Sequence, residues 1–495
     1  MRQAETNDYS DRLNSVRGDI KNTWRILKNV INKNGPQTSL HNCFSHRGTK
    51  ITNFDQIADI FNEYFVSVGP SLAKSINVVK KDPTIYLKGN HTASMFLRDT
   101  DDKEIYNVIM KQKSNKASGY DDISIDVVKH TADVLSKPLA FIFNTSLANG
   151  IFPDSLKIAK VIPIHKNGDK GCFCNYRPIS VLCTFSKLLE TVFHSRLVNY
   201  VNFNNILNES QYGFRDKRST NFALLDLIEE VRQSLEENKA TAGIFLDLRK
   251  AFDTINHDIL LQKLYFYGIR GIPYQWIKSY LTDRVQFVSY NQTYSTMLPL
   301  TCGVPQGSIL GPLLFIIYIN DICNISAQLK FVLFADDTNV FISHESKKQM
   351  ETILNSELEN LDIWFKTNKL SLNTEKTNFI VFQKKSDLFP NENIRLYIDN
   401  VQINRIHNTK FLGVVLDSKL TWNKHITEIE NKISKNIGVI SRARNILHTK
   451  ELQTLYCSLI LPYLNYGVLL WGNNYQSSLN RIIKLKKGHQ NNWHG

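Results

Sequence analysis

Hydrophobic and polar residues follow two different periods along this chain, and the period changes near residue 101. Up to about residue 100, apolar residues recur at helical spacing, as in residues 22–27 and 57–65, and no catalytic constellation appears among them. Beyond Asp101, short apolar runs of strand length alternate with amphipathic helices. This pattern predicts an α+β core, in which helices back an antiparallel sheet with split βαβ character. Beyond Leu420 the chain is helical and basic.

The individual elements follow from the same periodicity. We expect a hairpin over residues 329–343 and strands at residues 160–166, 242–246, 285–290, 296–300, 379–382 and 411–416. We expect helices that carry residues 104–112, 224–235, 258–266, 273–281, 309–322 and 350–365. Residues 309–322 are almost wholly apolar, so this helix should be buried, and Ser308 is its expected N-cap. Ser219 or Thr220 is expected to cap the helix that carries residues 224–235.

Two neighbouring carboxylates interrupt the expected hairpin at its centre. Apolar, β-prone runs flank Asp336 and Asp337, which places the turn near these two residues. Adjacent carboxylates repel each other, and a divalent cation would remove that cost, because Mg²⁺ is held by one or two carboxylates together with substrate phosphates. The alternative is a solvated Asp-Asp turn. A second apolar strand, 242–246, leads directly into Asp247, so Asp247 and Asp336 could share a metal ion if the two strands lie side by side.

Basic residues accompany three further segments. Lys166 and Arg177 flank a turn with two glycines, and on the two arms of a hairpin they would form a clamp for a triphosphate; the alternative is two ordinary surface cations. Residues 211–215 interleave aromatic and cationic residues and precede further cations, as expected for stacking on single-stranded nucleic acid with phosphate contacts. The cations in question are Arg215, Lys217 and Arg218, and a basic loop at Lys116 could also contact a phosphate backbone.

Composition agrees with a nucleic-acid partner and argues against a membrane protein. The 495 residues carry a formal net charge of +14, which favours a polyanionic partner over a generic basic surface, and 42% hydrophobic residues exclude a disordered chain. The seven cysteines show neither a zinc pattern nor a disulfide framework. No secretory signal begins the chain, and Pro462 and Asn465 interrupt the most apolar late stretch. We therefore expect an intracellular protein of the nucleus, the cytoplasm or both, not a secreted one.

Eight blocks in order resemble the reverse transcriptases of non-LTR (LINE-type) retrotransposons, in particular the jockey-like group. Together they span residues 101 to 420. They are the Lys116 loop, Lys166 with Asn-Tyr-Arg-Pro-Ile-Ser (175–180), Gln-Tyr-Gly-Phe-Arg (211–215), Phe-Leu-Asp-Leu-Arg-Lys-Ala-Phe-Asp (245–253), Gly-Val-Pro-Gln-Gly-Ser (303–308), Phe-Ala-Asp-Asp (334–337), Leu-Ser-Leu-Asn-Thr-Glu-Lys-Thr (370–377) and Phe-Leu-Gly-Val (411–414).

The resemblance implies a right-hand polymerase. Residues 1–100 would be a helical extension, 101–240 the fingers, 241–420 the palm and 421–495 a partial helical thumb, with the reverse transcriptase domain overall at about 145–420. The implied activity is RNA-directed DNA synthesis from an RNA template, a DNA primer and deoxynucleoside triphosphates. An alternative is another polymerase of the same palm type, such as an intron-encoded or telomere-type reverse transcriptase. The helix start at residues 308–315 and the lack of segments specific to those groups count against it.

The same resemblance assigns roles to individual residues. Asp247, Asp336 and the Leu248 carbonyl would hold two Mg²⁺ ions, with Mn²⁺ as the alternative ion, and Asp337 would complete the catalytic set. Lys166 and Arg177 would hold the triphosphate. Three further residues complete the implied nucleotide site: Phe252 as a gate against a ribose 2′-hydroxyl, with core packing as its alternative; Gln306 beside the nascent base pair; and Lys376 near the leaving pyrophosphate, with a plain surface lysine as its alternative.

The chain also departs from the family pattern. Its N-terminal part does not resemble an apurinic-type endonuclease, it has no Cys/His knuckle, and after Gly472 the usual continuation is lost. These departures suggest an element truncated at both ends. The alternative function is therefore a catalytically inactive remnant that only binds nucleic acid.

Overall fold

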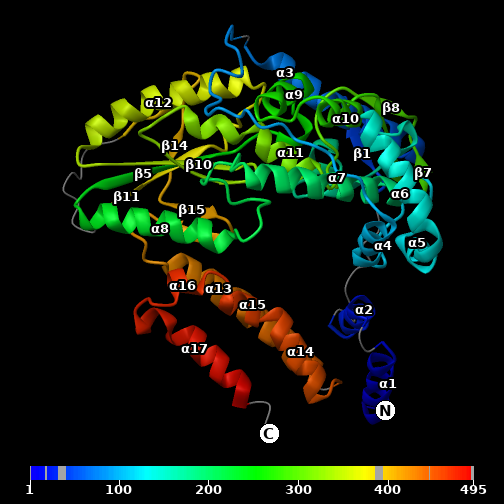
Figure 1. The fold of residues 1–495 in the computed structure, drawn as a ribbon. Helices are drawn as coiled ribbons and strands as arrows, with labels where there is room; N and C mark the ends of the chain where they lie inside the picture. The colour runs from blue at the N-terminus through cyan, green and yellow to red at the C-terminus, as the bar shows by residue number, and fades with distance from the viewer. Residues whose placement is uncertain are drawn as a thin grey trace.

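The computed structural model describes residues 2–16, 19–31, 41–77, 79–384, 394–444 and 446–491. Its helices and strands form an α+β fold, as the periodicity predicts, with two five-stranded sheets and three small hairpins in the described part of the chain. Figure 1 shows the two sheets side by side in the upper part of the molecule, with the C-terminal helices below the central sheet, which is described next.

The central sheet carries the segments with conspicuous aspartates. Its order is β14 (Asn404–Arg405), β11 (Asn378–Phe382), β5 (Ala240–Leu246), β10 (Asp337–His344) and β9 (Lys330–Phe334), and only the β11–β14 pair is parallel. The predicted hairpin is confirmed as β9–β10. Its two turn residues are Ala335 and Asp336, because Phe334 already pairs with Asp337. Ala335 has a positive φ of 54°, as tight hairpin turns require.

Both faces of the central sheet are buried, and β5 contributes to both. Ile244 and Leu246 belong to the core that includes α12 (Lys347–Thr367), whereas Phe245 belongs to the core that includes α8 (Thr220–Glu236). Alternate residues of a strand point to opposite faces, so a wholly apolar strand is expected between two layers. Figure 1 shows this arrangement, with α12 on one side of the sheet and α8 on the other. Ser219 caps α8 through the Phe222 N–H, as predicted.

The second sheet is built around the predicted basic hairpin. Its order is β4 (Tyr176–Leu182), β3 (Ile158–His165), β6 (Arg284–Tyr290) and β7 (Thr293–Tyr294), and β8 (Leu298–Leu300) also pairs with β6. The N-terminal α3 (Phe54–Ser75) packs on β6, and Phe44 of the β1 (Phe44–His46)–β2 (Thr49–Ile51) hairpin joins the same aromatic core. In the turn between β3 and β4, the sulfur atoms of Cys172 and Cys174 are bonded to each other, a pairing that the sequence did not predict.

Helices fill the space around the two sheets. Besides α8, those between α3 and the β9–β10 hairpin are α4 (Asp102–Lys111), α5 (Ile125–His130), α6 (Ala132–Asn149), α7 (Thr184–Phe203), α9 (His257–Phe266), α10 (Ile272–Leu281) and α11 (Gly311–Tyr318). The predicted 309–322 helix is shorter than expected: α11 ends at Tyr318 and a 3₁₀ helix, Asn320–Asn324, follows. Ser308 is not the formal N-cap, although its hydroxyl accepts a hydrogen bond from Gly311 N at 3.0 Å.

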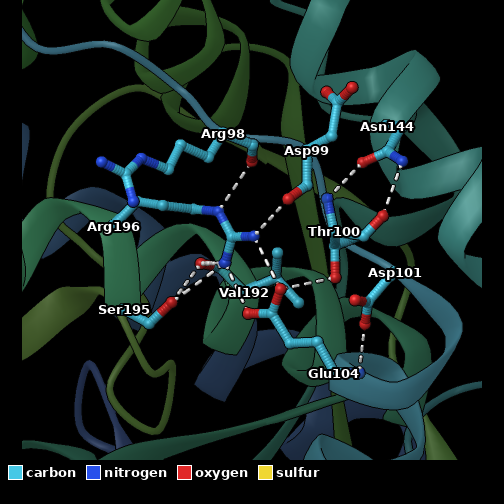
Figure 2. Close-up of polar contacts among 9 residues, drawn as sticks. All are labelled: Arg98, Asp99, Thr100, Asp101, Glu104, Asn144, Val192, Ser195 and Arg196. Atoms are coloured by element: carbon cyan, nitrogen blue, oxygen red, sulfur yellow. Dashed lines mark hydrogen bonds and ion pairs between the residues drawn. The ribbon is translucent and has the colours of Figure 1, made fainter.

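One arginine fastens the segment before α4 onto α7. Arg196 donates to both carboxylate oxygens of Glu104, at 2.6 and 2.7 Å, and to the main-chain carbonyls of Arg98 and Asp99 (Figure 2). Asn144 of α6 exchanges two hydrogen bonds of 2.8 Å with the main chain of Thr100. Residues 95–100 have no regular secondary structure, and these side chains hold them in place.

The C-terminal part departs from the prediction at residues 411–416. These residues do not extend the central sheet. They form a separate hairpin of β15 (Asn408–Phe411) and β16 (Val414–Asp417), because Leu412 and Gly413 both take positive φ and reverse the chain. The remaining C-terminal elements are β12 (Tyr397–Ile398), β13 (Val401–Gln402), α13 (Asn423–Ala443), α14 (Thr449–Leu459), α15 (Leu461–Asn465), α16 (Val468–Trp471) and α17 (Gln476–Asn491).

The N-terminal helices lie near these C-terminal ones. α1 (Arg2–Ser15) packs on α2 (Ile20–Ile31), and α2 contacts α13. Among the described residues, no helix is both long and apolar enough to cross a membrane.

Candidate active site

The three aspartates singled out in the sequence lie at neighbouring strand ends. β5 and β10 are antiparallel partners with Leu246 opposite Thr338, so Asp247 follows the end of β5 where β10 begins with Asp337. Asp336 occupies the adjoining turn. The structure therefore brings together the two motifs that the sequence separates by almost ninety residues.

The pKa values of Asp336 and Asp337 are both raised, first of all by burial. Partial burial raises the pKa of Asp337 to about 6, and the charges of Asp336 and Asp247 add to this effect. The pKa of Asp336 is also raised, first by burial and also by Asp247, while Arg177 and Lys166 oppose the shift. Because these carboxylates lie close together, each additional negative charge in the site costs free energy.

This donor set suits a hard divalent cation. Carboxylate oxygens and a main-chain carbonyl are the ligands that Mg²⁺ prefers, and a cation would relieve the repulsion described above. The Leu248 carbonyl accepts no hydrogen bond from the described residues. In the same part of the chain, no group of three or more His, Cys, Asp or Glu side chains is placed so that it could hold a metal ion. Mg²⁺ sites of one or two carboxylates rely on substrate phosphates for further ligands.

Asn373 fixes the position of Asp247, a role that the sequence did not reveal. Its side-chain nitrogen donates to Asp247 Oδ2 at 3.0 Å, and its main-chain N–H donates to the Asp247 carbonyl at 2.8 Å. The Asp247 N–H in turn points to the Thr377 hydroxyl at 3.4 Å. Both partners belong to the 370–377 block, so this block supports the first carboxylate.

Gln211 supports the turn of the β9–β10 hairpin from the other side. Its side-chain oxygen accepts hydrogen bonds from Gly213 N at 2.8 Å and Ala335 N at 3.1 Å, and the residue is almost completely buried. The main chain on either side of Gln211 pairs with Leu333 of β9. The 211–215 block therefore acts as an extra strand segment beside the hairpin that carries Asp336.

The two predicted clamp residues lie on the arms of one hairpin that faces the carboxylates. Ile164 pairs with Arg177, and Lys166 N donates to Asn175 O at 2.9 Å, so β3 and β4 carry both cations near the turn. Both side chains are exposed. They act electrostatically on Asp336, and Lys166 also acts on Asp337. Lys250 feels the same charges: burial is the main cause of its lowered pKa, and the charges of Lys166 and Arg177 lower the pKa further.

Phe252 and Gln306 lie on two loops that touch. The Phe252 ring stacks on Phe315 of α11 with centroids 4.5 Å apart, while its side chain remains partly exposed. Val304 N donates to the Phe252 carbonyl at 2.9 Å. Gln306 is partly exposed, and its main-chain oxygen accepts from Ser180 N of β4 at 2.8 Å. Core packing thus holds one side of the Phe252 ring without enclosing it.

The predicted nucleic-acid contacts differ in their surroundings: the arginines bond to other residues of the protein, whereas the lysines are exposed. Arg215 donates to the carbonyls of Asn208 and Gln211, and Arg218 pairs with Glu209 and lies over the Tyr212 ring. Both arginines thus have partners within the protein. The other two predicted nucleic-acid contacts, Lys116 and Lys217, are exposed, and so is Lys376, the residue expected near the leaving pyrophosphate.

Comparison with known proteins agrees with this geometry. Residues 164–416 match the sequence model of the family described as reverse transcriptase (RNA-dependent DNA polymerase), and this range contains Lys166 and the three aspartates. The chain belongs to the reverse transcriptase family. The family implies a right-hand polymerase fold, with which the mixed helices and sheets of this chain are compatible.

Relatives from mobile elements extend the similarity over most of the chain. It is 27% identical to the RNA-directed DNA polymerase from mobile element jockey of Drosophila melanogaster over 501 residues, 98% of this chain and 53% of the relative. Two probable RNA-directed DNA polymerases of the same fly are also similar: the transposon X-element protein at 29% identity over 77% of this chain and 42% of its own, and the transposon BS protein at 30% over 78% and 43%. The resemblance to jockey-like reverse transcriptases is therefore confirmed. The chain spans about half the length of these relatives or less.

Proposed function

We propose that this chain is an RNA-directed DNA polymerase that extends a DNA primer along an RNA template with deoxynucleoside triphosphates. One observation carries the proposal: three aspartates at adjacent strand ends face a hairpin with two exposed cations. Phosphoryl transfer requires little from a protein beyond positioning and charge stabilisation, and this arrangement supplies both.

Each group has a part in this proposal. Asp247, Asp336 and the Leu248 carbonyl would hold divalent ions, which lower the cost of deprotonating the primer 3′-hydroxyl and of charge on the transferring phosphate. Asp337 adds negative charge beside them. Arg177, a planar fork, and Lys166, a point charge, bind and orient the triphosphate. Lys376 would lie near the leaving pyrophosphate.

The regions of a right hand follow from these assignments. Residues 101–240 would be the fingers, 241–420 the palm and 421–495 helices of the thumb, with residues 1–100 as an extension. The central sheet lies within the proposed palm, apart from the first residue of β5, and the β3–β4 hairpin lies within the proposed fingers. Exposed Lys116 and Lys217 would contact the nucleic-acid backbone.

The test is primer extension on poly(rA) with oligo(dT), dTTP and Mg²⁺. We expect product from the wild type and none from an Asp247→Ala, Asp336→Ala double variant, with RNA binding retained by both. An Asp133→Ala, Asp258→Ala double variant is the matched control, because it also removes two carboxylates, both exposed and in first helical turns. RNA binding without extension by the wild type would instead support the inactive, nucleic-acid-binding alternative.

Phe252 is proposed as the residue that selects deoxyribose. Its ring is held on one side by Phe315 and is partly exposed, as a rigid steric gate requires. Phe252→Ala should increase ribonucleotide incorporation relative to deoxynucleotide incorporation. Unchanged sugar discrimination, measured as the ratio of kcat/KM for dTTP and UTP, would assign Phe252 to core packing alone.

A further inference from the structure

The loop that carries Gln306 is fastened to the turn after Phe252. Gly303 N donates to the Ile255 carbonyl at 2.8 Å, and Val304 N donates to the Phe252 carbonyl at 2.9 Å. Gly303 has a φ of +80°, and a Cβ atom there would lie 2.9 Å from Asp253 Cα. The two main chains therefore approach so closely that only glycine fits, and they hold each other in register.

Asp253 is the side chain between these two segments. Its Oδ1 accepts a hydrogen bond from Gln306 Nε2 at 2.7 Å. Its Oδ2 is buried and has no hydrogen-bond partner among the described residues. A cavity of about 30 Å³ adjoins the carboxylate and is also lined by His257 and Arg284. Burial raises the pKa of Asp253 to about 6.

The hydrogen bond to Asp253 Oδ1 fixes the orientation of the Gln306 amide, because only the amide nitrogen can donate. The NH₂ end of the amide must face Asp253, and the oxygen end must point elsewhere. Within the described part of the chain, no hydrogen bond engages Gln306 Oε1. The Gln306 main chain is meanwhile held by Ser180 of β4, the strand that also carries Arg177.

We propose that Asp253 is a positioning residue for nucleotide selection, which fixes the Gln306 side-chain amide so that its free oxygen is presented to the nucleotide site. This inference rests on the proposed polymerase function. Asp253 acts through Gln306 and does not touch the reacting atoms. If Asp253 were mainly structural, its replacement would change folding and all kinetic constants together. If Asp253 positions Gln306, its replacement changes nucleotide affinity only in a protein that retains Gln306.

A double-mutant cycle tests this dependence by primer extension. Asp253→Ala should raise the KM for dTTP about tenfold, the effect of losing a hydrogen bond to a charged group, with kcat within about threefold. Gln306→Ala should have a similar effect, and the double variant should be no worse than either single one. Asp253→Asn keeps an acceptor of the same shape and should stay within about threefold of the wild-type KM. Asp258→Ala, an exposed carboxylate in the following helix, is the control.

Three results would overturn the inference. In the first, the effects of Asp253→Ala and Gln306→Ala on the KM multiply in the double variant. In the second, Asp253→Ala has the same KM as the Asp258→Ala control. In the third, Asp253→Asn raises the KM as much as Asp253→Ala does. If Asp253→Ala does not fold, Gln306→Glu replaces it: two facing carboxylates should raise the KM, and adding Asp253→Asn should restore it, whereas no restoration refutes the role. An inactive wild type would overturn the proposed function and this inference with it, while an active wild type with independent variants overturns the inference alone.

Discussion

Replacing Gly213 by alanine should misplace the turn that holds Asp336 without unfolding the protein. A Cβ atom at Gly213 would lie 2.3 Å from Ala335 N and 3.0 Å from Phe334 C, both main-chain atoms of the turn that holds Asp336. Contacts between carbon and neighbouring heavy atoms are favourable only near about 3.5 Å, so the two segments must separate by about 1 Å. No flexible side chain can absorb this shift, because the opposing atoms are backbone.

The size of the effect can be estimated from this displacement. Overpacking a well-ordered interior costs about 1–3 kcal/mol, which lowers the Tm of a protein of 495 residues by about 1 °C for each kcal/mol. A catalytic group displaced by about 1 Å loses about 100-fold in rate. We therefore expect a variant that is folded, binds RNA, and has a kcat about 100-fold below that of the wild type in single-turnover primer extension.

Gly438→Ala is the matched control for this prediction. Gly438 lies within α13, and a Cβ atom there meets nothing within 4 Å. Alanine favours the helical backbone by about 0.5–1 kcal/mol, so Tm should rise slightly and kcat should not change. The reasoning is refuted if Gly213→Ala keeps both Tm and kcat, and equally if its kcat falls only in proportion to the unfolded fraction.

Three further predictions concern charged groups. Arg177→Ala should raise the KM for dTTP about 10-fold to 100-fold through the lost charge-assisted contact; a larger loss of template affinity than of nucleotide affinity would place Arg177 on the template instead. Burial, then Lys432 and Lys410, lower the pKa of His425 to about 4, so the unfolded state binds the proton first and stability should fall by about 1.4 kcal/mol per pH unit between about pH 6.5 and 4. Thermal unfolding of His425→Gln, compared with the wild type over this range, should lack that contribution, and an identical slope would contradict it. Arg196→Ala should lower the stability by about 2–3 kcal/mol, measured by thermal unfolding against an Arg232→Ala surface control, and an equal Tm for both would show that the Glu104 contact contributes nothing net.

The hydrophobic pattern predicted the strands at the site because a charged residue ends each apolar run. An apolar run that ends abruptly in a carboxylate is visible in one sequence, and Asp247 and Asp336 were found in this way. The β3–β4 hairpin was visible because glycines separate two alternating runs. The hairpin at 408–417 was missed because Leu412, a residue that rarely adopts positive φ, shares the turn with Gly413.

The supporting residues of the site could not be found from spacing. Gln211, Asn373 and Asp253 act through hydrogen bonds to segments distant in the sequence, and no period marks them. The only available signal was a polar residue inside a family block. The buried pair of Lys263 and Asp321, 2.6 Å apart, is a similar case, because periodicity assigns both to helix faces and says nothing of their meeting.

Because both faces of β5 are buried, activity should depend on the packing of both layers that cover this strand. Because its residues alternate between two separate cores, the strand that leads into Asp247 loses support if either layer loosens. Damage in α8 or in α12, on opposite sides of the sheet, should therefore reach the same carboxylate. Catalysis would then report on the integrity of distant helices that never contact a nucleotide.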